Sequence, residues 1–293
     1  MVSLIWQITI DALGMAMIYV LLASGLNLII GVNRIVLVAY GNFYMLGAYA
    51  FWFLATLLRW PYVFSLCGSI LISAMLGGVV YLAIFRYTQR HEQRFLTNLT
   101  AALGLMMVMG QAAVLLLGTD AKSVPSAFPG RITILGAGIS RDRVVIIVLG
   151  LLLTVAVGIF LRKTNIGRAM RAVAYKPDVA ALQGVNPGKV YLATMVVGCG
   201  VAGFAGALIA PLFPVAQTMS SIIMIILLVV MFGGIGSMVG AIVAGLIFAL
   251  GQSFGQSFIG TGLAQIVVFL IVGVIIYFRP GGLFGRPGAD VGV

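Results

Sequence analysis

The sequence has almost no charge over most of its length. Only 8% of its 293 residues are Asp, Glu, Lys or Arg, whereas a soluble globular domain has about 25%. Residues 190–278 contain no Asp, Glu, Lys, Arg or His. A water-soluble core does not require such a long uncharged stretch, but a bilayer does, because charged side chains are costly in hydrocarbon. The chain is therefore predicted to be an integral membrane protein.

The sequence also has few of the side chains that act as catalysts, proton carriers or metal ligands. It has one histidine, His91, in a basic loop, and two cysteines, Cys67 and Cys199, without a CxxC partner. Its acidic residues lie at the edge of the first apolar window, in loops or in the tail: Asp11, Glu92, Asp120, Asp142, Asp178 and Asp290. Proton-coupled carriers, redox enzymes and metalloenzymes need titratable or ligating groups at membrane depth. No catalytic residue and no metal site is predicted.

Instead, the chain has a series of uncharged windows, most of them about as long as the roughly 20 residues of one spanning helix. They are residues 12–33, 35–58, 60–85, 95–119 and 144–161, followed by 190–278, which has room for about four crossings. Breaks are expected at 211–221, 233–237 and 251–262, which leaves short pieces at 222–232 and 239–250. We predict an all-α bundle of about eight to ten transmembrane helices, including discontinuous or re-entrant segments.

Basic residues predict the orientation of this bundle. Lys and Arg in short loops are retained on the cytoplasmic side. Placing Arg34, the loop 86–94, the loop 162–189 and the tail 279–286 inside assigns twelve of the 17 basic residues to the cytoplasm. The C-terminus is then cytoplasmic, and the loop 118–143 is external, either as a plain connector or as a docking surface for an extracytoplasmic partner. The whole chain, 1–293, is expected to form a single transmembrane domain.

Two glycine patterns do not predict nucleotide binding. Residues 198–203 spell G-x-G-x-x-G, but they lie inside an apolar window without a preceding strand or a following acidic residue. Extended to Gly206, this run predicts close approach of helices. Residues 184–190 resemble a phosphate loop but have three residues between the glycines, and Val190 where Ser or Thr should be. No cofactor is expected in this chain, so a second subunit would have to supply any nucleotide energy.

The basic segment 162–189 is the most informative soluble part. Residues 167–175 have a helix-forming composition, Pro177 can begin a second short helix, and Gly184 can end it in the left-handed conformation. Two short helices would form a compact knob that a partner protein could grip. The alternative is a basic loop that only enforces topology and touches lipid headgroups.

Five motifs follow one another along the chain: 25–32 (GLNLIIGV), 40–49 (YGNFYMLGAY), 164–185, 233–237 (GGIGS) followed by Gly240, and 279–285 (RPGGLFG). Together they resemble the LivH-type permease subunit of the branched-chain amino acid ABC transporter family. The resemblance covers nearly the whole chain. It implies a multi-pass protein of the bacterial inner membrane with a LivM-type second permease, two ABC ATPases (LivG- and LivF-type) that hold ATP and magnesium, and a periplasmic substrate-binding protein. No nucleic-acid partner is expected.

The resemblance also implies that residues 168–184 couple the permease to an ATPase. The E-A-A-x-x-x-G signature of other importers is only partly present, because Ala180 and Ala181 lack the preceding Glu and are separated from Gly184 by two residues instead of three. The residues expected to take part in coupling are Gly167, Arg168, Arg171, Ala172, Asp178, Ala180, Ala181 and Gly184.

Neutral polar side chains within the apolar windows are the candidates for the translocation path. We predict that Asn27, Tyr40, Asn42, Gln252 and Gln256 line it, and Asn98, Gln111 and Gln265 are further candidates. Each could instead make a hydrogen bond between helices. Asn42 is favoured because its glycine-flanked block suggests a discontinuous helix.

Three classes of function remain at this point. The first is an ABC importer permease for branched-chain amino acids, or alternatively for urea or short amides. The second is a passive channel for small neutral solutes. The third, a membrane-embedded enzyme or scaffold, is disfavoured because the apolar windows contain no grouping of nucleophile, base and ligand.

Overall fold

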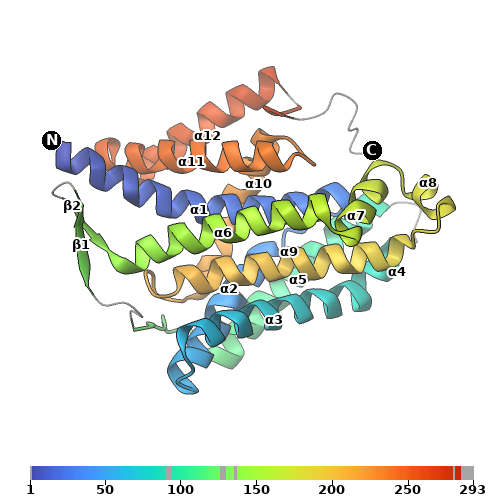
Figure 1. Cartoon of the computed structure of the whole chain (residues 1–293), viewed down its shortest axis with the longest axis horizontal. Helices are drawn as coiled ribbons and strands as arrows, with labels where there is room; N and C mark the ends of the chain where they lie inside the picture. The colour runs from blue at the N-terminus through green and yellow to red at the C-terminus, as the bar shows by residue number, and fades with distance from the viewer. Residues whose placement is uncertain (1, 90–93, 126–129, 135–136, 280, 285–293) are drawn as a thin grey trace.

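The computed structural model describes every residue except 1, 90–93, 126–129, 135–136, 280 and 285–293. The chain forms an elongated bundle whose long helices run roughly along one axis (Figure 1). This confirms the predicted all-α, polytopic architecture. His91, Glu92 and Asp290, and residues 280, 285 and 286 of the basic tail 279–286, lie outside the described residues.

Seven helical segments of the described chain are long and apolar enough to cross a membrane. They are α1 (Val2–Asn33), α3 (Tyr62–Val80) with its extension through Tyr81–Phe85 and α4 (Arg86–Thr88), α5 (Arg94–Leu117), α6 (Arg141–Lys163), α9 (Pro187–Ile209), α11 (Met238–Ile259) and α12 (Thr261–Phe278). Two more apolar windows give the shorter helices α2 (Tyr40–Trp52), continued by Phe53–Leu57, and α10 (Ile222–Gly233), preceded by Gln217–Ser221. Of the eight to ten crossings expected, seven therefore reach full spanning length.

The helices are interrupted where the backbone departs from helical geometry. Residues 34–39 lie outside any helix, so the window 35–58 is not one continuous span. Between α10 and α11 the chain turns through Gly234 and Gly236, with φ of 98° and 81°, conformations that favour glycine. The break expected at 251–262 is only partly correct, because α11 continues to Ile259 and ends at Gly260, where φ is 89°. Gly255 lies within α11 and packs beside Ala264 of α12.

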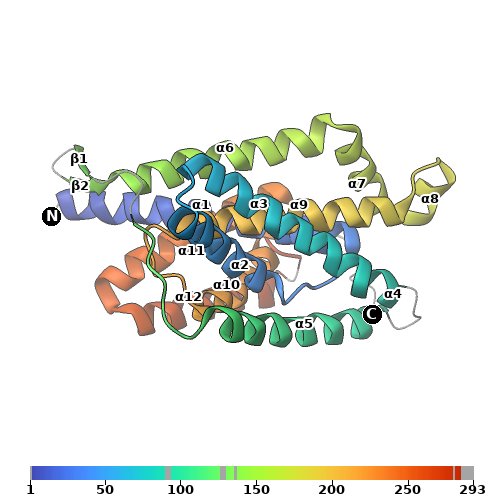
Figure 2. The same ribbon diagram turned by 90° about the horizontal axis from the view of Figure 1, so that it is seen from below.

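Helices α1 and α9 form the centre of the bundle. In each of them 78% of the apolar window is buried, compared with 11% in α5 and 17% in α12. Helices α5 and α6 lie on opposite sides of the molecule (Figure 2). The apolar side chains of the outer helices therefore lie on the surface of the bundle, and the core consists of α9 with α1, α2 and α3 around it.

Glycines of α9 allow this close packing. A Cβ atom on Gly203 would lie 2.2 Å from Ser73 Oγ of α3, and one on Gly206 would lie 1.9 Å from the carbonyl oxygen of Tyr44 in α2. Gly198 faces Ile29 of α1 in the same way. The prediction that the run 198–206 serves close helix approach is confirmed.

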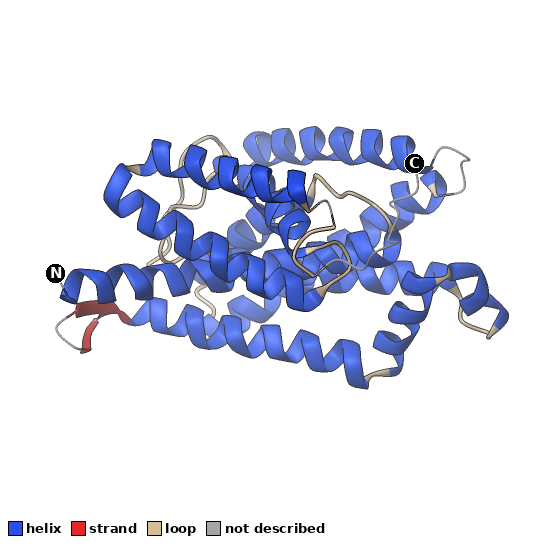
Figure 3. Cartoon of the chain, turned by 90° about the horizontal axis from the view of Figure 1, so that it is seen from above, coloured by secondary structure: helices blue, strands red, loops and turns tan. Residues whose placement is uncertain are grey.

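The basic segments of the chain gather at one end of the bundle. The side-chain amide of Asn33, at the end of α1, donates to the backbone carbonyl oxygen of Tyr191 (3.1 Å). The backbone carbonyl oxygen of Asn33 accepts from the side-chain amide of Gln89 (3.4 Å). These bonds bring Arg34, Arg86 and the start of α9 together. The loop 118–143, which was predicted to be external, contains a hairpin of β1 (Arg131–Ile134) and β2 (Ala137–Ser140) at the other end of α6, beside the N-terminus (Figure 3).

The packing of α9 against α2 predicts a difference between two glycines. Gly206→Ala should destabilise the protein by about 1–3 kcal/mol, because the added methyl meets backbone and the core is overpacked. Gly104→Ala on α5 is the matched control, since a Cβ there meets nothing within 4 Å. The thermal midpoint of the detergent-purified protein, measured by size exclusion, reports the effect. Equal midpoints for the two variants would contradict this account of the core.

Candidate translocation path and coupling segment

The segment between α6 and α9 folds as the two short helices predicted, α7 (Asn165–Tyr175) and α8 (Pro177–Leu182). Thr164 caps α7, because its hydroxyl oxygen accepts from the backbone N–H of Gly167 (3.0 Å). Pro177 occupies the first turn of α8, and Gly184 follows its end with φ of 84°. Helix α8 projects from the end of the bundle (Figure 1). We call residues 164–184 the knob.

The knob is fastened to the membrane helices. Gly167 lies so close to α6 that a Cβ would be 2.5 Å from the carbonyl oxygens of Phe160 and Leu161. The guanidinium of Arg171 donates to the carbonyl oxygen of Leu161, which satisfies the end of α6. A small apolar cluster joins the knob to α1 and α9; its buried members are Leu28, Val32, Met170, Val173, Ala180 and Val190. The knob is therefore in direct contact with α1, α6 and α9.

The residues expected to take part in coupling divide into two groups. Arg168, Arg171, Asp178, Ala181 and Gly184 are exposed, and Ala172 is half-buried. Gly167 and Ala180 are buried inside the knob. These two residues serve the packing of the knob, because neither presents a surface that a partner could touch.

Besides Ile166 in its first turn, which is 50% exposed, the knob has three exposed apolar side chains that were not identified from the sequence. Tyr175, Val179 and Leu182 have exposed fractions of 73%, 47% and 89%. They lie on α7 and α8, outside the seven helical segments that are long enough to span a membrane. In the sequence, the one sign of such a surface was that apolar residues occur within a basic segment. Only the structure shows that these side chains face outward.

Asn27 joins α1 to the turn between α10 and α11. Its amide nitrogen donates to the carbonyl oxygens of Ser237 (2.7 Å) and Gly234 (3.4 Å), and its Oδ1 accepts from the backbone N–H of Gly236 (2.6 Å). The side chain is 3% exposed. Asn27 therefore holds a partly buried turn, in which only Gly234 is fully buried and whose backbone groups have lost their helical partners.

Tyr40 and Asn42 likewise bond to neighbouring helices. The Tyr40 hydroxyl donates to the carbonyl oxygen of Gly198 (3.1 Å), and the Asn42 amide donates to that of Met106 (2.7 Å). Both side chains are 1% exposed. Asn98 is also buried and accepts from the Thr88 hydroxyl (2.6 Å). In this conformation these side chains connect helices and do not face an open path.

The two glutamines predicted on α11 differ. Gln252 accepts a hydrogen bond from the Tyr19 hydroxyl of α1 (2.7 Å). Gln256 is exposed and lines a cavity of about 270 Å³, together with Ser253 and Ser257 of the same helix. Of the five residues predicted for the path, only Gln256 lines this cavity. Gln111 and Gln265 are exposed on α5 and α12.

Two charged residues line this cavity, Asp11 and Arg143. The sequence placed Asp11 at the edge of the first apolar window, but the structure places it within a helix. Asp11 lies well inside α1 and forms an ion pair with Arg143, in the first turn of α6. Asp142, beside it, is also part of α6 and is 6% exposed. Hydropathy windows end at charged residues, but a helix continues through them when a neighbouring helix supplies a partner.

Comparisons with known proteins agree on one family. The family model described as "Branched-chain amino acid transport system / permease component" matches residues 8–278. The high-affinity branched-chain amino acid transport system permease protein LivH of Escherichia coli K12 is 27% identical over 287 residues, which cover 93% of this chain and 92% of that protein. No solved structure matches this chain.

Two further relatives carry similar names. The permease protein BraD of Pseudomonas aeruginosa is 26% identical over 97% of both chains. The permease protein LivM of Escherichia coli K12 is 25% identical over 78% of this chain and 59% of its own length. The chain is thus similar to two kinds of permease from one transport system.

The bonds of Asn27 predict a large effect of its removal. Asn27→Leu keeps a similar volume but leaves groups of the 234–237 turn unpaired, at a cost of about 1–3 kcal/mol for each buried group. The thermal midpoint should fall well below that of Gln111→Leu, a matched change at an exposed position of α5. If both variants unfold at the wild-type temperature, Asn27 does not hold the turn.

Proposed function

This chain belongs to the family of branched-chain amino acid transport system permease components, and from that premise we propose that it is the membrane-spanning permease subunit of an ATP-driven importer. It forms part of the path by which branched-chain amino acids cross the bilayer. The observation that carries the proposal is the family match over residues 8–278, which include every helix from α2 to α12.

The character of the bundle supports this substrate class. A branched-chain amino acid has an apolar side chain, and at neutral pH its two charges cancel. Such a solute can cross between apolar helices if polar side chains exchange hydrogen bonds with it, and no permanently charged path is needed. Gln256, Ser253 and Ser257 supply such groups beside a cavity.

The energy for transport comes from partner subunits in this proposal. Two ABC ATPases, of LivG and LivF type, bind ATP and magnesium and grip the knob. The exposed apolar residues Tyr175, Val179 and Leu182 enter a groove of an ATPase, and Arg168 and Asp178 surround them with charge. Closure of the ATPases then displaces α1, α6 and α9 through the contacts that fasten the knob.

The proposal also places the protein in its membrane. It lies in the inner membrane of a bacterium, with the knob and the C-terminus in the cytoplasm and the hairpin in the periplasm. This orientation is supported by the basic segments that meet at the knob end. A LivM-type second permease completes the path, and a periplasmic binding protein delivers the substrate near the hairpin.

Uptake by the reconstituted importer tests the function. Vesicles that contain this chain, its second permease and the ATPases should accumulate leucine only with ATP and binding protein. Isoleucine and valine should compete, whereas urea and acetamide should not. Competition by urea or acetamide alone would show an amide importer, and ATP-independent flux through this chain alone would show a passive channel.

A single substitution tests the docking surface on the knob. Leu182→Glu places a charge at an 89% exposed apolar position, so burial in an ATPase groove becomes costly. We expect at least a tenfold loss of ATPase co-purification, with membrane insertion and thermal midpoint unchanged. Ser123→Glu introduces the same charge at an exposed position near the opposite end and serves as the matched control.

Two observations would contradict this docking surface. One is normal ATPase association and uptake in the Leu182→Glu protein. The other concerns the side of the membrane: in a Cys67→Ser background, Leu182→Cys should react with an impermeant thiol reagent in inside-out vesicles but not in intact cells. Labelling in intact cells would place the knob outside.

A further inference from the structure

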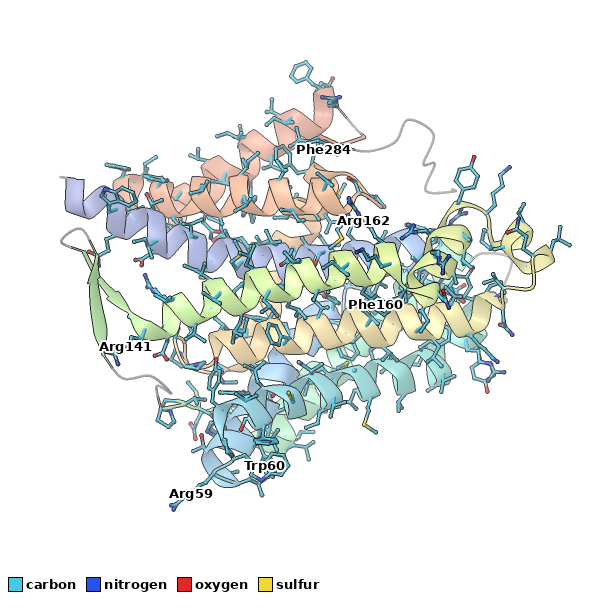
Figure 4. The ribbon with its side chains drawn as sticks, in the orientation of Figure 1. Arg59, Trp60, Arg141, Phe160, Arg162 and Phe284 are labelled. Atoms are coloured by element: carbon cyan, nitrogen blue, oxygen red, sulfur yellow. The ribbon has the colours of Figure 1, made fainter. Side chains whose placement is uncertain are left out.

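A cavity at the hairpin end of the bundle combines opposite charges with an apolar wall. It lies between α1, α6, α11 and the residues that follow α9, and its volume is about 270 Å³. Arg141, labelled in Figure 4, marks the end of α6 that contributes to it, whereas Arg162 marks the opposite end near the knob. The cavity therefore lies on the side from which an importer receives its substrate.

The charges come from helices that are distant in the sequence. Asp11 of α1 pairs with Arg143 of α6, and their side chains are 39% and 31% exposed. Gln256, Ser253 and Ser257 of α11 add neutral hydrogen-bonding groups to the same cavity. Ionisable residues inside membrane helices are costly and usually mark a substrate path. A pair that served only to join α1 to α6 would not need a cavity beside it.

The rest of the lining is apolar. It consists of Ile8, Met15, Ile146, Ile209, Leu212 and Phe213, with Gly14. The cavity, at about 270 Å³, lies just below the volume of about 300–1,000 Å³ that ligand pockets usually have, so it has room for one small molecule and not for a peptide. Its walls offer two opposite charges and an apolar surface, which are the three features that a free hydrophobic amino acid presents.

We propose that this cavity is a binding site for a zwitterionic amino acid with an apolar side chain, a proposal that rests on the proposed function. The Asp11 carboxylate receives the ligand's ammonium group, and the Arg143 guanidinium receives its carboxylate with two parallel hydrogen bonds. The side chain of the ligand lies against Ile146, Leu212 and their neighbours. Gln256 and the two serines complete the hydrogen bonds.

The exchange of partners keeps the site electrically balanced. A partly exposed ion pair contributes little to stability, so it opens at small cost. The ligand brings one charge of each sign. Its ammonium group takes the place of Arg143 beside Asp11, and its carboxylate takes the place of Asp11 beside Arg143. An amine or a carboxylic acid alone can replace only one partner and leaves the other charge unpaired. The site therefore discriminates zwitterions from their singly charged analogues.

Binding of radiolabelled leucine to the assembled importer, in lipid nanodiscs without the binding protein, tests this site. Asp11→Asn and Arg143→Gln should each weaken binding at least tenfold. Arg59→Gln, an exposed arginine outside the cavity, is the matched control and should bind as the wild type does. Isoamylamine and 4-methylpentanoate, which each lack one charge of leucine, should compete at least tenfold more weakly than leucine.

The conservative variants Asp11→Glu and Arg143→Lys keep both charges and should retain binding, so the test survives if a neutral variant fails to assemble. Undiminished binding in Asp11→Asn and Arg143→Gln, or no binding by the wild type, overturns the site. ATP-driven leucine uptake by the wild-type complex, measured with the binding protein, separates the two proposals. If uptake proceeds while the site fails, the importer function stands without it.

Discussion

The close approach of α9 to α1, α2 and α3 is the constraint on which the rest of the structure depends. Lipid tails are as apolar as the helix surfaces, so no hydrophobic force drives these helices together. Close packing supplies the attraction instead, and it requires that no side chain stand between the backbones. Gly198, Gly203 and Gly206 meet that requirement, each facing a different neighbour.

This packing holds polar groups in fixed positions at membrane depth. Tyr40 reaches the carbonyl oxygen of Gly198 because α2 begins beside the glycine surface of α9. Asn27 of α1 holds the turn between α10 and α11, whose backbone would otherwise be unsatisfied in the bilayer. The breaks in the helices are therefore ordered. If the hydrogen-bond partners of Tyr40 or Asn27 changed, the helices around them would adopt a different arrangement.

The two ends of α6 carry different chemistry. One end is joined to the knob through Gly167 and Arg171, and the other contributes Arg143 to the charged cavity. A rigid helix 23 residues long joins them. In the importer that we propose, α6 alone would connect the proposed substrate site to the proposed ATPase-docking knob, and residues 144–161 between them carry no charge.

The sequence by itself determined the membrane class, most of the spanning windows and the local form of the knob. These are properties of consecutive residues: charge, apolar length, and the backbone preferences of Pro177 and Gly184. The tertiary structure decided which polar residues meet. Asn27 was predicted to line a path and instead holds a turn more than two hundred residues away, while Asp11, read as an edge residue, pairs with Arg143. Such pairings depend on how helices are placed beside one another, and glycine packing, not local sequence, sets that placement.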